Sequence, residues 1–327
     1  MTAFFSGLLI FFILSGVFVY WGSGGPQSPK EFTGEVISFS ASTDSFADTD
    51  KFSQLRVLSW NIGYGYGMGS AGEGYATKSR AHFERELLKM VKLFDEYKID
   101  VALIQEIDQD SGRSGHLDQV KYLAENSNLR FAAYAPSWKA NYVPFPYWPP
   151  TNHFGKVYSG GAVLSRFPIL ENRINLWSKP SSFSYIYNFF YLFRYTQNVL
   201  LQLPNGREYS FVNSHLEAFD DVHRDRQGKW MAERVDRYLS EGSPVLAIGG
   251  DFNVDSQSRS AQALMALFPG FRDTFAGSNL LSFPADKPDR RIDYILVKKE
   301  NSVQSRKIPQ VGEISDHLPL ILEVDLN

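Results

Sequence analysis

The stretch VLAIGGDFNVD, residues 245–255, joins a short apolar run to two glycines and a group of polar side chains. Val245 to Ile248 form the continuous apolar run that is typical of a strand covered on both faces. Burial in a sheet does not explain Asp251 or Asn253, which follow it, while Gly249 and Gly250 allow other atoms to approach the backbone closely. The stretch therefore predicts a core strand whose end presents polar groups to a site.

Other apolar runs also end in a polar residue whose side chain could take part in catalysis or bind a metal. These side chains are Asn61, Glu106, His215 and Asp293, and Asp316 and His317 lead into the last run. Strand ends meet at one edge of a sheet, where a side chain is held firmly and stays accessible. We expect these residues to form one site.

From about residue 55, strand-like runs alternate with amphipathic stretches, which predicts an α/β domain. The turn PNGR, residues 204–207, favours a hairpin. The expected helices span 77–97, 116–125 and 221–241. The expected strands span 56–60, 101–106, 131–135, 160–166, 197–203, 208–215, 245–250, 291–299 and 318–326.

The composition limits the classes of protein to consider. The chain has 327 residues, of which 43% are hydrophobic, so it can bury a sizeable core. Its net charge of -3 argues against a protein that binds polyanions over a broad basic surface. The absence of cysteine excludes disulfides, cysteine zinc sites and thiol nucleophiles.

The N-terminus reads AFFSGLLIFFILSGVFVYW at residues 3–21 and contains no charged side chain. As a helix it would span roughly 28 Å, close to the thickness of a bilayer core. We favour an uncleaved anchor at 1–22 over a cleaved secretory signal, with a buried soluble helix as the third alternative. Sparse flanking charge leaves the orientation undecided, and we favour a single-pass membrane protein with its catalytic domain outside the cytoplasm.

Residues 23–54 are rich in Gly, Ser, Thr and Asp, which predicts a flexible tether with a short strand near 36–39. The catalytic domain is expected at 55–327.

Glu106 and Asp316 offer hard oxygen ligands that suit Mg²⁺ or Mn²⁺ better than Zn²⁺. The alternative for an isolated acid is a helix cap or a surface ion pair. His215 and His317 could act as the acid and base of a hydrolysis, with Asp293 as partner of one of them, although a lone histidine is more often structural.

Uncharged and charged donors complete the candidate set. Asn61 and Asn253 could hold a phosphoryl oxygen, and Asp251 could polarise a water or assist a leaving group.

Seven motifs, in this order, resemble the endonuclease/exonuclease/phosphatase superfamily with its DNase I-like fold: LSWNIG, LIQEID, GGAVLSRFPI, VNSHLEAF, GGDFNVD, RIDYILV and SDHLPL. The resemblance runs from about residue 55 to the C-terminus. It implies an α/β/β/α sandwich of four layers, in which two packed mixed sheets are flanked by helices. It also implies metal-dependent hydrolysis of a phosphoester.

The resemblance also implies roles for single residues. Glu106 resembles the principal metal ligand, with Asn61 and Asp316 nearby, and Asn253 resembles a phosphate donor. His317 resembles the base, oriented by Asp293. His215 resembles the acid of the DNase I and sphingomyelinase branches, and its presence disfavours the abasic-site repair branch. The resemblance leaves two roles open for Asp251, which could position water or transfer a proton.

Two further candidates for substrate binding are less specific. Arg113 lies in QDSGRSGHLDQVKYLAE, which resembles a stretch found after the metal-binding Glu of bacterial members, so it could reach the substrate phosphate or lie in a solvated loop. Tyr158 stands in YSGGAVLSR, where many relatives have Tyr-Gly-Asn before the strand, so its contact with phosphate is open.

Two aromatic segments bear on the substrate. Residues 182–195, SFSYIYNFFYLFRY, could cover the sheet or form an aromatic wedge at a bilayer interface. Residues 142–155, YVPFPYWPPTNHFG, could stack on a base or insert into lipid.

Three functions stay open. We favour a monomeric, membrane-tethered, divalent-metal phosphodiesterase that acts on a phospholipid head group or another phosphorylated small molecule. A DNA or RNA nuclease of the same fold is disfavoured by the acidic composition. A non-catalytic binding module is disfavoured because all seven motifs keep their polar residues.

Overall fold

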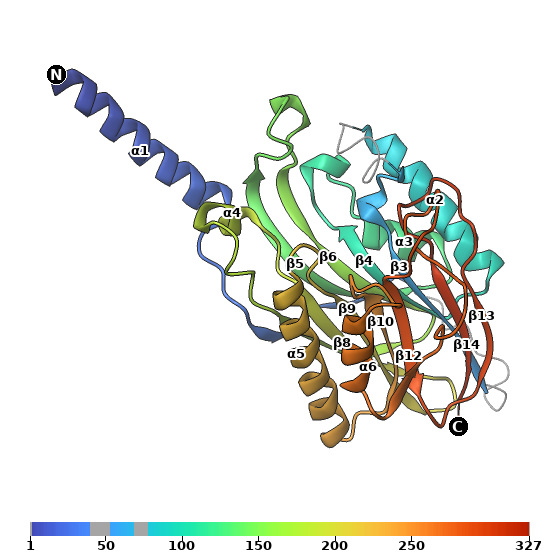
Figure 1. Cartoon of the computed structure of the whole chain (residues 1–327). Coiled ribbons are helices and arrows are strands. Elements are labelled where there is room, and N and C mark those ends of the chain that lie inside the picture. The colour runs from blue at the N-terminus through green and yellow to red at the C-terminus, as the bar shows by residue number, and fades with distance from the viewer. Residues whose placement is uncertain (1, 40–52, 69–77, 327) are drawn as a thin grey trace.

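The computed structural model describes residues 2–39, 53–68 and 78–326. Helix α1, Thr2–Gly22, projects from a body that contains two seven-stranded sheets (Figure 1). The first sheet has the order β1 (Glu31–Thr33), β7 (Ile169–Leu176), β8 (Tyr195–Gln202), β9 (Glu208–His215), β10 (Val245–Asp251), β12 (Asp293–Lys298) and β11 (Phe271–Asp273). The second has the order β13 (Val303–Lys307), β14 (Leu320–Asp325), β3 (Gln54–Asn61), β4 (Val101–Asp108), β6 (Gly155–Ser165), β5 (Phe131–Val143) and β2 (Val36–Ser38).

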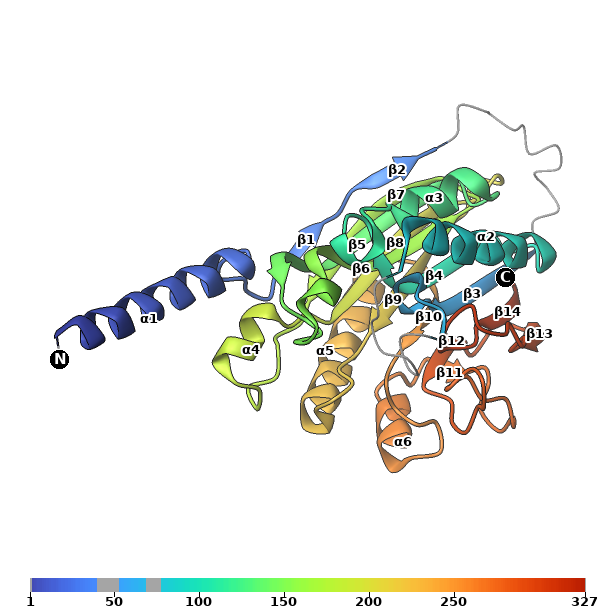
Figure 2. The same cartoon turned by 90° about the horizontal axis from the view of Figure 1, so that it is seen from above.

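Both sheets are mixed, because β9 and β10 are parallel in the first and β3 and β4 in the second, next to antiparallel neighbours. Helices α5 (Asp221–Ser240) and α6 (Arg259–Ala266) cover the first sheet, while α2 (Arg80–Glu96) and α3 (Gln119–Asn126) cover the second (Figures 1 and 2). The expected four-layer sandwich is confirmed.

Alternation along the strands builds the layers. In β3, Val57 packs between the two sheets and Leu58 packs under the outer helices. In β4, Leu103 and Ile104 divide in the same way. A strand that is covered on both faces has a continuous apolar run. The predicted apolar run at the start of β10 is buried in this way.

A buried polar network also joins the sheets. Gln105 Nε2 of β4 donates to Asn213 Oδ1 of β9 at 2.7 Å, and Asn213 Nδ2 donates to the carbonyl of Ile104 at 3.0 Å. On the same interface, Gln197 Nε2 donates to the carbonyl of Ala133 at 3.0 Å. Since buried polar groups need partners, this network fixes how the sheets sit on one another.

The expected helices appear as α2, α3 and α5, with shifted ends. Strand β7 was not predicted, because Glu171, Asn172 and Arg173 interrupt its apolar pattern. Strand β5 continues to Val143 past the predicted end, through register shifts that absorb Pro136. Residue 77, the predicted start of the first helix, lies outside the described residues.

The expected tether at 23–54 includes the short strand predicted near 36–39, which appears as β2. Residues 31–38 form β1 and β2, which pair with β7 and β5 and so add an edge strand to each sheet. The backbone hydrogen bonds of these short strands hold this part of the segment on the body. Residues 40–52 lie outside the described part of the chain. Helix α1 is long and apolar enough from Phe4 to Gly22 to be a membrane span or a signal sequence, and it is not buried in the body.

Candidate active site

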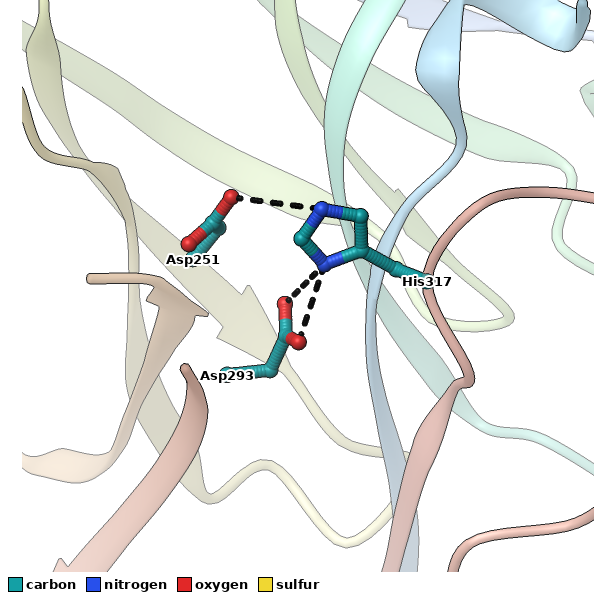
Figure 3. A group of neighbouring side chains, drawn as sticks. All are labelled: Asp251, Asp293 and His317. Carbon is teal, nitrogen blue, oxygen red and sulfur yellow. Dashed lines mark hydrogen bonds and ion pairs between the residues drawn. The ribbon is translucent and has the colours of Figure 1, made fainter. Parts of the chain in front are cut away.

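Asp251, Asp293 and His317 meet at one edge of the sandwich (Figure 3). His317 Nδ1 lies 3.0 Å from Asp293 Oδ2, and His317 Nε2 lies 3.8 Å from Asp251 Oδ2. Asp251 ends β10 and Asp293 begins the neighbouring β12, where the two are register partners. His317 precedes β14 of the other sheet. The two sheets thus place one imidazole between two carboxylates.

The two glycines of β10 are required by close packing. Gly250 has φ +147°, and a Cβ atom there would lie 1.8 Å from the carbonyl oxygen of Ser214. A Cβ atom on Gly249 would lie 2.8 Å from Leu103 Cδ1. A larger residue at 250 would push β10 away from β9, so glycine keeps Asp251 in its place.

Neighbouring groups orient the cluster. Trp60 Nε1 donates to the carbonyl of His317 at 2.8 Å, and Ser282 Oγ donates to Asp293 Oδ2 at 2.6 Å. Ser315 Oγ donates to the carbonyl of Asn61 at 2.8 Å. The sequence analysis singled out none of these three donors. Trp60 and Ser315 lie far along the chain from the carbonyl groups that accept their hydrogen bonds, and no motif marks Ser282. Such partners hold a site group in one orientation.

Asn61 and Asn253 both contact Asp251. Asn61 Nδ2 donates to Asp251 Oδ2 at 3.0 Å, and the backbone N–H of Asn253 donates to Asp251 Oδ1 at 2.9 Å. Asn253 adopts φ +53°, a strained conformation for a residue with a side chain, and its Nδ2 donates to the carbonyl of Leu216. The structure brings both predicted amides into the site.

Burial and neighbouring charges act against one another in the buried pair of Asp251 and His317. Burial lowers the pKa of His317, but the carboxylates of Asp293, Asp251 and Asp316 outweigh it and raise this pKa well above its ordinary value. Burial raises the pKa of Asp251, against the opposing charge of His317. The pair can therefore hold and pass a proton in the range where an enzyme works.

Glu106 lies on a bulge of β4, where the pairing with β6 shifts register between Ile104 and Ile107. Glu106 adopts φ +53°, and its side chain is 22% exposed to solvent. Burial and then the charge of Asp316 raise the pKa of Glu106 to about 7. The bulge turns a strand residue toward the site while leaving it accessible to solvent.

The donor set around Glu106 fits a hard divalent cation. Glu106 and half-buried Asp316 repel one another. Asn61 pairs with Gln105, the neighbour of Glu106, and accepts from Ser315, the neighbour of Asp316, while its amide oxygen accepts from the N–H of Gly63 at 3.0 Å. Carboxylate and amide oxygens are ligands that Mg²⁺ and Mn²⁺ prefer. Asp251, Asp293 and His317 also offer ligand atoms within 4.8 Å of one another. In that second group, however, Asp293 already accepts hydrogen bonds from His317 and Ser282.

Arg194 is the site residue that the sequence analysis missed. Its guanidinium Nη1 lies 2.6 Å from His215 Nε2, and its Nε lies 3.6 Å from Glu217 Oε2. It is buried at the start of β8, next to Glu106, whose charge it offsets. The one available signal was that Arg194 is the single charged residue of the aromatic segment 182–195.

His215, the residue expected to act as the acid, lies in contact with Arg194. An arginine is always charged and only donates, so Nε2 of His215 accepts this hydrogen bond and the imidazole is neutral. Burial and the charge of Arg194 lower the pKa of His215 well below its ordinary value. In this arrangement Nε2 carries no proton to give to a leaving group.

The structure does not bring Arg113 or Tyr158 into the cluster. Arg113 is buried, donates to Asp108 Oδ1 at 2.9 Å and lies 3.5 Å over the ring of Tyr64. Tyr158 packs edge-to-face on Tyr134, at 5.6 Å between ring centres, on the helix-covered side of its sheet. Asp108 is buried and needs a counter-charge, which explains why Arg113 turns inward instead of toward a substrate.

Solved structures with the same fold include one endonuclease/exonuclease/phosphatase family protein from Bacteroides thetaiotaomicron, with 19% identity and a TM-score of 0.60 over 84% of this chain and 98% of that chain. A mannosyl-6-phosphatase from the same organism has 19% identity and a TM-score of 0.58 over 83% and 99%. TDP2 of D. rerio, in complex with a single-strand DNA product, has 14% identity and a TM-score of 0.57 over 84% and 100%. These identities show the fold alone.

No curated protein matches the chain in sequence. The model of the Endonuclease/Exonuclease/phosphatase family, in contrast, matches residues 58–317, which include every residue of the cluster described above. This chain therefore belongs to the endonuclease/exonuclease/phosphatase family, whose members hydrolyse phosphoesters.

Proposed function

We propose that this chain is a membrane-tethered, divalent-metal-dependent phosphodiesterase that acts on a phospholipid head group or a similar phosphorylated small molecule. The observation that carries the proposal is the meeting of Glu106, Asp251 and His317 at one edge of the sandwich, with Glu106 still accessible. The exposed apolar surface of α1 supports the tether. We also propose that the chain acts as a monomer.

In the proposed hydrolysis, the oxygen of a water attacks phosphorus, the ester P–O bond breaks and the leaving oxygen takes up a proton. His317 acts as the base in its neutral form, which positive charge held by Glu106 and Asp316 would favour by offsetting the carboxylates around the ring. Its free Nε2 then accepts the proton of the attacking water, since Asp293 holds Nδ1–H. Asp251 faces the same Nε2 and helps to position that water and share the proton. Asn253 and Arg194 are the proposed donors to the oxygens of the phosphoryl group.

Glu106, Asp316 and Asn61 are the residues that would hold Mg²⁺ or Mn²⁺. When bound, the cation supplies positive charge that stabilises the phosphoryl oxygens in the transition state. His215 orients the guanidinium of Arg194 beside Glu106. The leaving oxygen takes its proton from solvent water, which reaches the site at the accessible side chain of Glu106.

A nuclease is the second candidate, because the fold is shared with a TDP2 structure that contains a single-strand DNA product. The net charge of -3 disfavours it, since binding to a polyanion gains most of its affinity from basic side chains. A non-catalytic binding module is disfavoured because the pKa values of the partly accessible Glu106 and the buried Asp251 are both raised, as is typical of residues at a catalytic site.

The proposal is tested with the full chain in detergent micelles with Mg²⁺, on a panel of phospholipids, oligonucleotides, plasmid DNA and inositol phosphates. Asp251→Ala and His317→Ala should each abolish hydrolysis of bis(p-nitrophenyl) phosphate and leave the circular dichroism spectrum unchanged. Asp255→Ala, an exposed acid of the same loop, is the matched control and should keep full activity. Undiminished turnover in either site variant would refute the assignment, and activity confined to nucleic acids would favour the nuclease.

A further inference from the structure

Two segments next to α1 have no charged side chain. Residues 142–152 and 180–193 contain no Asp, Glu, Lys or Arg, although these four make up 21% of the chain. At that frequency, 25 residues would carry about five charges. Both segments instead hold large aromatic side chains, and one of them includes the short helix α4, Tyr185–Phe190.

Six large side chains of these segments are exposed to solvent, and four of them are more than half exposed. The exposed fractions are 70% for Tyr147, 81% for Trp148, 79% for Tyr185 and 63% for Ile186. We refer to these four residues as the aromatic rim. Soluble proteins seldom expose such side chains together, and an exposed apolar patch marks a binding surface.

Ring contacts fix the C-terminal end of α1 beside both segments. Phe18 contacts Tyr142 at 6.1 Å and Phe190 at 6.3 Å between ring centres. Asn141 Nδ2 donates to the carbonyl of Trp21 at 2.8 Å. Both views show α4 lying beside the point where α1 leaves the body (Figures 1 and 2). Whatever surrounds α1 at that level therefore also meets these two segments.

The chemistry of this surface fits a lipid bilayer better than a protein partner. Helix α1 exposes apolar side chains over a length that spans a membrane, and its Phe4–Gly22 part is not buried in the body. Tyr and Trp are the residues enriched at the level of lipid head groups, and three of the four rim residues, Tyr147, Trp148 and Tyr185, are of these types. A protein interface would be expected to carry charged groups in its rim, and these segments lack charged side chains.

We infer that the aromatic rim lies in the head-group region of the bilayer that α1 spans, so that the catalytic domain rests on the membrane instead of hanging from a tether. This inference rests on the membrane anchor of the proposed function. It extends to the site, because α4 is followed by Tyr191, whose hydroxyl donates to Glu217 at 2.8 Å and accepts from Arg194 at 3.4 Å. Docking of α4 would thus connect the bilayer surface to the site through Tyr191 and the arginine that it contacts.

Single cysteines can test the inference, since the natural chain has none and each introduced thiol carries one label. Nitroxide labels are placed at Trp148→Cys and Ile186→Cys in the rim and at Leu9→Cys in α1. Leu88→Cys on α2 is the matched control, because Leu88 is apolar and 41% exposed but lies away from α1 (Figure 1). The full chain is reconstituted in phosphatidylcholine and phosphatidylglycerol vesicles, and collision of each label with oxygen and with a water-soluble nickel chelate is measured.

We expect labels at 9, 148 and 186 to collide mainly with oxygen, and the label at 88 to collide mainly with the chelate. Chelate collision at 148 and 186 equal to that at 88, with the label at 9 in lipid, would overturn the docking and keep the anchor. If the label at 9 collides mainly with the chelate, or if cleavage removes residue 9 from the chain, both the docking and the anchor are overturned. Hydrolysis of bis(p-nitrophenyl) phosphate by the same samples reports on the enzyme separately, and full activity is expected in all four variants.

Discussion

The guanidinium of Arg194 lies 2.6 Å from Nε2 of His215, and both side chains are buried. A permanent cation in contact with an imidazole keeps that imidazole neutral and uses its one free acceptor. The pair therefore belongs to the positive side of the site, opposite the carboxylates of Glu106 and Asp251.

Replacing this arginine tests whether it binds the phosphoryl group. Arg194→Gln should lower kcat/KM for bis(p-nitrophenyl) phosphate on the order of 10²-fold or more, because a charged donor to the transition state is lost. Arg194→Lys should keep only part of the kcat/KM of the parent, since an ammonium group cannot reach His215 and Glu217 together. Arg237→Gln, 52% exposed on α5, is the control. An unchanged kcat/KM in Arg194→Gln would contradict the assignment.

Asp293→Asn should reduce kcat by about 10²–10⁴-fold with little change in KM. The amide can no longer hold Nδ1–H of His317 as an ionised acceptor, so the imidazole loses its orientation and basicity. Steady-state kinetics with bis(p-nitrophenyl) phosphate measure this, with Asp289→Asn as the control because Asp289 is 62% exposed. Equal kcat values in parent and Asp293→Asn would remove the orienting role.

Glu106→Gln should raise the Mg²⁺ concentration for half-maximal activity by roughly 10–100-fold, because a carboxylate ligand becomes a neutral amide. Activity is measured against Mg²⁺ after treatment with EDTA, which should stop hydrolysis by the parent. Glu313→Gln, an exposed acid near Asp316, should titrate like the parent. Superimposable curves for Glu106→Gln and the parent would show that Glu106 is not a ligand.

Arg113→Met should destabilise the fold by about 3–5 kcal/mol, because Asp108 is left buried without its counter-charge. At a few degrees per kcal/mol, Tm should fall by about 10 °C, while KM of the folded enzyme stays the same. Differential scanning fluorimetry measures Tm, and Arg80→Met, 52% exposed, is the control. A raised KM with an unchanged Tm would instead support binding of substrate by Arg113.

Lys179 gives the stability a pH dependence. Burial lowers its pKa from 10.5 to about 8, while its Nζ donates to the carbonyl of Asn188 in α4 at 2.7 Å. Between these two values the unfolded chain binds more protons, so the free energy of unfolding should rise with pH there, by up to about 3 kcal/mol.

Urea unfolding at pH 7.5 and 9.5 measures this rise. Lys179→Met should lose it, whereas Lys299→Met, at an exposed position, should keep the pH dependence of the parent. If the difference between the parent and Lys179→Met did not change with pH, Lys179 would have an ordinary pKa in the folded chain.

Local patterns in the sequence predicted most of the sandwich. The apolar run at Val245–Ile248 and the helical pattern of 77–97 depend on which face of a strand or helix is buried, and this is written in neighbouring residues. Strand β7 escaped because Glu171, Asn172 and Arg173 break its alternation while its pairing with β8 supplies the stability. Asp251 and His317 were found because they follow or precede strong strand patterns.

By itself, the sequence determined most of the strands and helices, the apolar helix at the N-terminus and the polar residues at the strand ends, while the four layers followed from the resemblance to the superfamily. Only the tertiary structure decided which of these residues meet. It paired Arg194 with His215, which makes that imidazole neutral, and it buried Arg113 against Asp108 away from the site. The physical reason is that the charge state and the role of a buried group depend on the atoms across the sheet from it, and those atoms come from distant parts of the chain.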